Sequence, residues 1–170
     1  WINAGTYVLE PSVIARIPDG RKVSIERETF PAMVADGSLF AVESDDYWID
    51  AGTPAAYLQA QLDLVDGHRA AGPCDGVSPD AVVEAGATVT HSVVMAGAVV
   101  EEGAIVVDAV LLPGARVASG GEVTGSVIGP GALVEEGAVV TNLSVLGDGA
   151  VVEAGELLDG EHRPEEEGGK

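Results

Sequence analysis

One histidine in the second half of the sequence could take part in acid–base chemistry. His91 lies in the segment Thr90-His91-Ser92, and an imidazole can act as a general base that deprotonates a hydroxyl or an amine. The chain repeats a short pattern in this half, and the equivalent places in the next two copies hold Asp108 and Gly125. We therefore interpret His91 as a solvated turn residue.

Paired acids in the same half could imitate a metal site, because carboxylate oxygens are the ligands that hard cations prefer. The pairs are Glu101-Glu102 and Glu135-Glu136, and both occupy positions of the repeat that we expect to face solvent. Cys74 lies in a Gly- and Pro-containing linker where no histidine partner is fixed next to it to activate it as a nucleophile. None of these residues predicts a reactive centre.

His91 and the paired glutamates belong to five copies of one pattern. In this pattern an aliphatic residue recurs about every six positions, usually followed by Gly three places later and then by Ala. The aliphatic position has no polar exception among its fifteen occurrences, which are Val77, Val83, Val89, Val94, Val100, Val106, Leu111, Val117, Val123, Ile128, Val134, Val140, Leu146, Val152 and Leu158. Repeats of this size are typical of solenoids, whose coils bury their apolar faces by stacking on one another. The pattern predicts a parallel β-helix of triangular section with glycines at its corners, but it does not determine the hand of the coils.

Composition and charge exclude several classes of partner. The net charge is −20, from 28 Asp and Glu against 8 Lys and Arg, which argues against binding to nucleic acid or to an anionic membrane. No apolar run approaches the roughly 18 residues that a membrane-spanning helix needs. A single cysteine fits a reducing compartment, so we expect a cytoplasmic protein.

The first 66 residues contain all the Trp, Tyr and Phe residues of the chain, and their pattern is that of an α/β domain. We predict strands over residues 4–10, 38–43 and 47–50. A short helix should begin after Ser24 and end at Pro31. A second helix should begin at Thr53-Pro54 and bury one face, made of Ala55, Leu58, Leu62 and Val65.

Three segments of this part carry a family resemblance: Asn3-Ala4-Gly5-Thr6-Tyr7-Val8, Ser24-Ile25-Glu26-Arg27-Glu28 with Phe30-Pro31, and Tyr47-Trp48-Ile49-Asp50-Ala51-Gly52-Thr53-Pro54. In this order they resemble the C-terminal third of the sugar-1-phosphate nucleotidyltransferase domain, in particular the mannose-1-phosphate guanylyltransferase type. The resemblance implies a mainly β fold, in which a left-handed parallel β-helix of hexapeptide repeats follows the C-terminal part of an α/β nucleotidyltransferase domain.

The resemblance also implies an activity. Enzymes of this family join a nucleoside triphosphate to a sugar 1-phosphate with the help of Mg²⁺, and they release pyrophosphate and a nucleotide sugar, here expected to be GDP-mannose. Asp50 matches a magnesium ligand, and Asn3, Gly5 and Glu26 match positions that bind the sugar. The alternatives are a surface-turn acid for Asp50, a structural turn for Asn3, and stabilisation of a helix N-terminus for Glu26. No residue of the chain matches a catalytic group.

Other family motifs have no counterpart in the sequence. The Gly-rich nucleotide loop, the first metal carboxylate and the sugar-phosphate lysine are missing, and Lys22 and Lys170 are the only lysines. We therefore expect the 170-residue chain to be inactive by itself. Because it opens at Trp1 in apolar, strand-like sequence, we expect it to be the end of a longer protein.

Two other interpretations stay open. A hexapeptide-repeat acyltransferase would use His91 as its base across a trimer interface, but the sequence has few basic residues to bind the phosphates of coenzyme A. A non-catalytic assembly or regulatory subunit would use the β-helix to form a homo-oligomer. The expected domain order is the nucleotidyltransferase part over 1–66, a linker over 67–76, the β-helix over 77–160 and a disordered acidic tail over 161–170.

Overall fold

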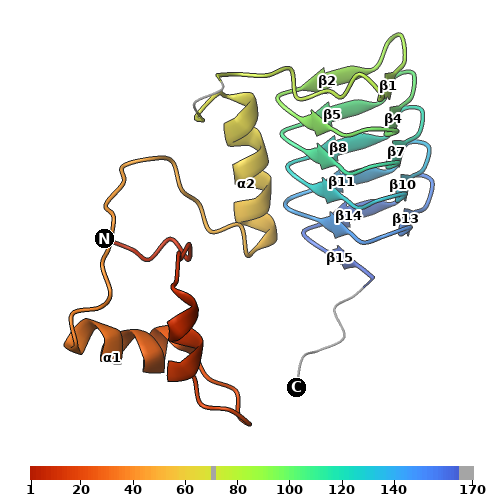
Figure 1. Ribbon diagram of the computed structural model, residues 1–170. Helices are drawn as coiled ribbons and strands as arrows, with labels where there is room; N and C mark the ends of the chain where they lie inside the picture. The colour runs from red at the N-terminus through yellow and green to blue at the C-terminus, as the bar shows by residue number, and fades with distance from the viewer. Residues whose placement is uncertain (70–71, 165–170) are drawn as a thin grey trace. The chain divides into compact units, whose positions relative to one another are not determined.

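The computed structural model describes residues 1–69 and 72–164. The chain, drawn in Figure 1, divides into two compact units, Trp1–Trp48 and Ile49–Lys170. The second unit contains a helix and a parallel β-helix, and the first contains only short helical segments among its described residues.

In the part of the chain that the structure describes, fifteen short strands form the β-helix and stack in three parallel five-stranded sheets (Figure 1). The first sheet contains β1 (Val82–Val83), β4 (Val99–Val100), β7 (Arg116–Val117), β10 (Leu133–Val134) and β13 (Val151–Val152). The second contains β2 (Thr88–Thr90), β5 (Ile105–Val107), β8 (Glu122–Thr124), β11 (Val139–Thr141) and β14 (Leu157–Asp159). The third contains β3 (Val93–Val94), β6 (Val110–Leu111), β9 (Val127–Ile128), β12 (Val145–Leu146) and β15 (His162–Arg163).

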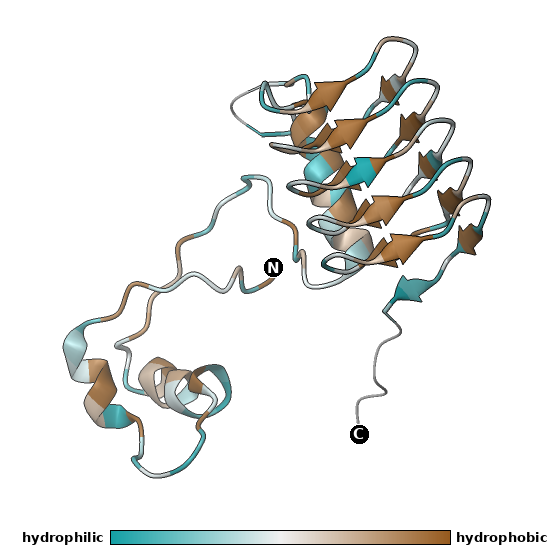
Figure 2. Cartoon of the chain, turned by 90° about the vertical axis from the view of Figure 1, so that its right-hand side faces the viewer, coloured by the Kyte–Doolittle hydropathy of each residue, from teal (hydrophilic) through white to brown (hydrophobic). Residues whose placement is uncertain are grey.

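The aliphatic residues of the repeat form the interior, as predicted. From Val94 to Leu158 each of them is at most 1% exposed, because they point into the prism and the inner coils are covered by a neighbouring coil on both sides. In the first coil Val83 is 40% exposed, since no coil precedes it among the described residues. Figure 2 shows the same distribution, with apolar strands along the stack and the hydrophilic strand β15 at its end.

Left-handed backbone conformations produce the corners. All the predicted corner glycines have positive φ, for example Gly114 at 73°, which glycine adopts without steric cost. One column of corners is less regular, because His91 and Asp108 have φ of 44° and 50° without being glycines. A Cβ on Gly129 would lie 2.4 Å from the carbonyl oxygen of Leu146, so neighbouring coils approach too closely there for a side chain.

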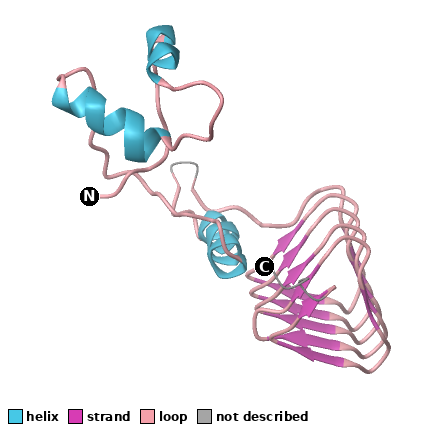
Figure 3. Cartoon of the chain, turned by 90° about the horizontal axis from the view of Figure 1, so that it is seen from below, coloured by secondary structure: helices cyan, strands magenta, loops and turns pink. Residues whose placement is uncertain are grey.

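Helix α2 (Pro54–Val65) covers the outer side of the third sheet (Figure 3). Its start is the predicted one, because the Thr53 hydroxyl oxygen accepts a hydrogen bond from the Ala56 amide at 3.2 Å. Leu58 and Leu62 pack against Val110 and Val127, which explains why this outer face is apolar. Ala55 is exposed, so its predicted place on the packed face is wrong.

The first unit is held by a small core. It contains the 3₁₀ helix η1 (Pro11–Arg16), the π-helical turn η2 (Ile25–Thr29) and α1 (Phe30–Ala35). Val13, Phe30 and Met33 are its buried residues. As predicted, the side chain of Ser24 caps the first turn, by accepting from the Arg27 amide at 3.3 Å. The predicted end at Pro31 is wrong, since Pro31 lies in the first turn of α1, where no amide donor is needed.

The three predicted strands of the first part are not strands in the structure. Residues 4–10, 38–43 and 47–50 lack strand pairing, and Val8 and Val42 are 100% and 96% exposed. A strand forms only against a partner, and the first unit supplies none among its described residues. The prediction recognised segments with strand-like composition but had no partner strand to assign to them.

Candidate functional site

The structure brings together the three predicted sugar-binding residues in the first unit. The Asn3 side-chain amide donates to the Tyr7 hydroxyl at 2.7 Å and to Glu26 Oε1 at 3.2 Å. The Gly5 amide donates to Asn3 Oδ1 at 2.9 Å, and Tyr7 donates to Glu26 Oε1. Asn3, Gly5, Tyr7 and Glu26 thus form one exposed polar cluster.

Two local structures position this cluster. Glu26 lies in the first turn of η2, whose start Ser24 caps. The Tyr7 ring packs edge-on against buried Phe30, with centroids 4.8 Å apart and planes at 74°. Apolar packing therefore fixes the tyrosine, and the tyrosine hydroxyl fixes the carboxylate.

Tyr7 is a cluster member that the sequence analysis did not select. Its hydrogen bond to Glu26 raises the pKa of the Tyr7 phenol above its usual value, because losing the proton would leave two negative groups in contact. The phenol is therefore neutral near pH 7 and can donate. The sequence offered one indication that Tyr7 belongs to the cluster: it lies in the same Asn3–Val8 segment as the predicted residues Asn3 and Gly5.

Asp50, the predicted metal ligand, belongs to the second unit. It is exposed, and its Oδ1 accepts from the Gly52 amide at 3.1 Å. A Cβ on Gly52 would lie 3.1 Å from the same oxygen, so glycine keeps this tight turn open. Helix α2 begins directly after this turn, at Pro54.

A shallow apolar groove of about 310 Å³ follows Asp50 in the second unit. It lies between the beginning of α2 and the third sheet, and it is lined by Ala51, Gly52, Thr53, Pro54, Tyr57, Leu112, Val127 and Val145. The carboxylate of Asp50 does not line this groove. The predicted metal ligand and the apolar groove are therefore separate features.

His91 is engaged on both ring nitrogens. Nδ1 lies 2.5 Å from Asp108 Oδ1 and Nε2 lies 3.0 Å from Asp66 Oδ1. The hydrogen bond with Asp108, followed by the charge of Asp66, raises the pKa of His91. His91 is therefore a turn residue, as predicted, but it is bound between two carboxylates rather than merely solvated, which does not favour the general base of an acyltransferase.

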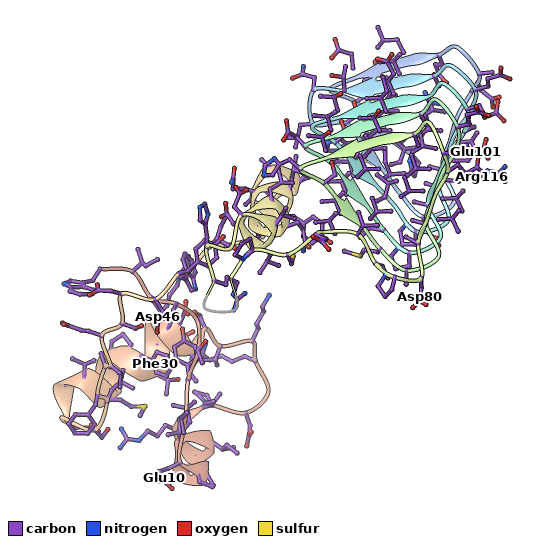
Figure 4. The ribbon with its side chains drawn as sticks, turned by 90° about the horizontal axis from the view of Figure 1, so that it is seen from above. Glu10, Phe30, Asp46, Asp80, Glu101 and Arg116 are labelled. Atoms are coloured by element: carbon purple, nitrogen blue, oxygen red, sulfur yellow. The ribbon has the colours of Figure 1, made fainter. Side chains whose placement is uncertain are left out.

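At a coil corner, the acidic residue Glu101 accepts a hydrogen bond from a backbone amide and forms an ion pair with a neighbouring arginine. Glu101 binds Arg116, with Arg116 Nε 2.5 Å from Oε1, and its Oε2 accepts from the Ser119 amide at 3.0 Å. Figure 4 shows Glu101 and Arg116 next to each other at the edge of the prism. The Glu101 side chain is only 14% exposed, so it is more enclosed than the solvent-facing position that was predicted for it, because Arg116 and the Ser119 amide bind its carboxylate.

Comparison with known sequences relates both parts of the chain to one kind of enzyme. Residues 71–162 match the family model described as GMPPB C-terminal domain, and residues 1–67 match the model described as nucleotidyl transferase. The chain belongs to the mannose-1-phosphate guanylyltransferase-like family. The fold expectation is thereby confirmed, including the left-handed β-helix.

Individual relatives agree with this assignment. The chain is 42% identical over 98 residues to mannose-1-phosphate guanylyltransferase of Mycobacterium tuberculosis, covering 56% of this chain and 27% of that protein. It is 51% identical over 57 residues to mannose-1-phosphate guanyltransferase of Hypocrea jecorina, covering 34% of this chain and 15% of that protein. The chain thus spans about a quarter or less of the length of these relatives.

A solved structure with a similar region is the acetyltransferase domain of PglB from Neisseria gonorrhoeae. It is 28% identical, covers 51% of this chain and 52% of its own, and has a TM-score of 0.33. This score is too low to support an argument about activity. In the described part of the chain, no helix combines the length and the apolar character that crossing a membrane requires.

Proposed function

We propose that this chain is the C-terminal part of an enzyme that joins GTP to mannose 1-phosphate, producing GDP-mannose and pyrophosphate. The observation that carries the proposal is the order of the two family matches, with the nucleotidyl transferase model over 1–67 followed by the GMPPB C-terminal domain over 71–162. The names of the similar proteins agree with it. We keep the expected nucleotidyltransferase part over 1–66 and the linker over 67–76 as part of the proposal. The β-helix, expected over 77–160, extends to β15 (His162–Arg163) in the structure, so the disordered tail expected from residue 161 does not begin there. Residues 165–170 of that expected tail lie outside the described residues.

The polar cluster of the first unit is the proposed sugar site. Asn3 offers an amide that both donates and accepts, and Gly5 leaves space for close approach of a ligand to the backbone. Glu26 uses Oε1 for its bonds from Asn3 and Tyr7, and we propose that Oε2 accepts from a sugar hydroxyl. The hydrogen bonds within the cluster support this role because they orient all three side chains before the sugar binds.

Asp50 is the proposed metal ligand. Enzymes of this family use a divalent metal, and we propose Mg²⁺ because an exposed carboxylate is a hard oxygen ligand. The bond from the Gly52 amide to Oδ1 holds the carboxylate in one orientation, which fits this role. When bound, the metal would neutralise charge between the two phosphate-bearing substrates.

Substitution of Asp50 tests this assignment. In the complete enzyme of which we propose this chain to be a part, Asp50→Asn should lower turnover by about two orders of magnitude or more, because an amide is a weak ligand for Mg²⁺. The measurement is pyrophosphate release at saturating substrates, with circular dichroism to show an intact fold. Asp80→Asn, at an exposed coil corner, is the matched control and should keep normal turnover. Normal turnover in Asp50→Asn would remove Asp50 from the site.

We also propose that the β-helix forms a homo-oligomer and that the 170-residue chain has no activity by itself. Large apolar side chains are exposed on the prism, among them Ile105 at 37% and Leu157 at 60%, and they support association with a second copy. Light scattering of the complete enzyme tests the assembly. A monomer at micromolar concentration would contradict it.

A further inference from the structure

A group of metal-ligating side chains lies where the C-terminal end of α2 meets the first coils of the β-helix. Asp63 is in the last turn of α2, Asp66 is its C-cap residue, and His68 follows two residues later. One ligand atom from each of the three lies within 4.8 Å of the other two. The group is outside the proposed sugar and magnesium residues.

The Asp63 carboxylate is the fixed part of this group. Its side chain is only 9% exposed, and its Oδ1 accepts from the Gln59 side-chain amide at 2.7 Å. The same oxygen lies 3.2 Å from His68 Nδ1. Carboxylates that bind metal ions are usually held in place by a hydrogen bond from a neighbouring group. The Gln59 amide holds the Asp63 carboxylate in this way.

The β-helix brings one further candidate ligand, His91, to Asp66, although His91 is outside the group of three that lies within 4.8 Å. His91 Nε2 lies 3.0 Å from Asp66 Oδ1, while the opposite ring nitrogen lies 2.5 Å from Asp108 Oδ1. Metal-binding histidines characteristically donate their second ring N–H to a carboxylate, which fixes the ring and its tautomer. Asp108 is in that relation to His91, and it directs Nε2 toward the group on α2.

We propose that Asp63, Asp66, His68 and His91 bind a divalent transition-metal ion, Zn²⁺ in the first instance, with Asp108 orienting His91. Two imidazole nitrogens and two carboxylate oxygens form a ligand set that suits zinc and is unlike the all-oxygen set that magnesium prefers. Ligand atoms about 2.0–2.2 Å from a tetrahedral ion are roughly 3.3–3.6 Å apart. The Asp63–His68 and Asp66–His91 separations of 3.2 and 3.0 Å are near this spacing.

Charge and position favour a cation at this place. The carboxylates of Asp63, Asp66 and Asp108 face the two imidazoles, and the carbonyl end of a helix attracts positive charge. The ion would join α2 to the first coils of the β-helix, so its role would be structural. The proposal does not depend on the proposed nucleotidyl transfer, because Asp50 is not a ligand.

Zinc binding to the full chain is the test. Zn²⁺ competed against a chromogenic chelator should bind with one ion per chain, and the unfolding temperature should rise with zinc because the ion binds the folded state. His68→Gln and His91→Gln should each weaken binding at least tenfold. Asp108→Asn should weaken it about 10- to 100-fold through His91. His162→Gln, at the far end of the stack, and Asp50→Asn should bind zinc normally.

Several outcomes would overturn the proposal: no saturable binding of one equivalent, equal binding in wild type and His68→Gln, or a loss of binding only in His162→Gln. If the ligand variants do not fold, the visible absorption spectrum of the wild-type protein loaded with Co²⁺ provides the test. An intense tetrahedral visible spectrum supports the site, and the weak spectrum of six-coordinate Co²⁺ contradicts it. Normal zinc binding in a complete enzyme that carries Asp50→Asn and has lost turnover would separate this site from the proposed active site.

Discussion

At the scale of single residues, Tyr7 connects two positions that are far apart in the sequence. Its hydroxyl accepts from the Asn3 amide at 2.7 Å and donates to Glu26, and its ring is held by Phe30. A tyrosine contributes both an apolar ring and a polar end. Tyr7 therefore transmits the rigidity of the small core to the proposed sugar site.

Removing the Tyr7 hydroxyl tests this role. In the complete enzyme, Tyr7→Phe should raise KM for the sugar 1-phosphate about fivefold, because one hydrogen bond of about 1 kcal/mol that orders Glu26 is lost. Steady-state kinetics measure the change, and turnover at saturation should change less. Tyr57→Phe removes the same group outside the cluster and should leave KM unchanged. If the two variants have the same KM, Tyr7 has no positioning role.

At the scale of elements, the coil corners use glutamates to bind the next coil. The carboxylates of Glu84, Glu101 and Glu135 accept from backbone amides of the following coil, those of Glu102, Ser119 and Ala154, each at 3.0 Å. Such amides would otherwise be unpaired at a bend of the chain. The acidic character of the repeat therefore has a structural function in addition to keeping the surface charged.

Glu101 predicts a pH dependence for this part of the fold. Arg116 is the main cause that lowers the Glu101 pKa from its usual 4.5. Since the folded pKa is the lower one, ionised Glu101 adds stability above pH 4.5, and this contribution is lost as the pH falls through the folded pKa. Glu101→Gln should therefore lower the urea midpoint at pH 7 and have little effect near pH 2.

A matched substitution isolates the effect of Glu101. Glu102→Gln changes the same charge on the next residue, which is exposed, and should have a small effect at both pH values. Equal shifts in the two variants at pH 7 would show that general charge repulsion, and not the Arg116 pair, determines the response.

At the scale of the whole molecule, stacking makes the cost of a substitution depend on its place in the stack. Val83 and Val117 occupy the same column of the first sheet. Val117 is fully buried, whereas Val83 is 40% exposed in the first coil. The two positions have the same residue and the same role in the repeat, so they differ mainly in burial.

Val117→Ala should lower the free energy of unfolding by about 2–3 kcal/mol, since two methyl groups are lost and a cavity remains. Val83→Ala should cost less than about 1 kcal/mol, because solvent already reaches this side chain. Urea denaturation of the two variants measures both values. Equal costs would mean that the first coil is covered by another part of the protein in solution.

The repeat by itself determined the β-helix, because each coil needs only an aliphatic residue inward and a flexible corner, and both are visible in a local pattern. The cap at Thr53 and the start of α2 were predictable for the same local reason. The strands expected over 4–10, 38–43 and 47–50 did not form, since strand pairing needs a partner that no local pattern contains. Tertiary structure alone decided that Tyr7 joins Asn3 and Glu26, and that Asp66 meets His91, because contacts between residues distant in the sequence arise only when the chain folds back on itself.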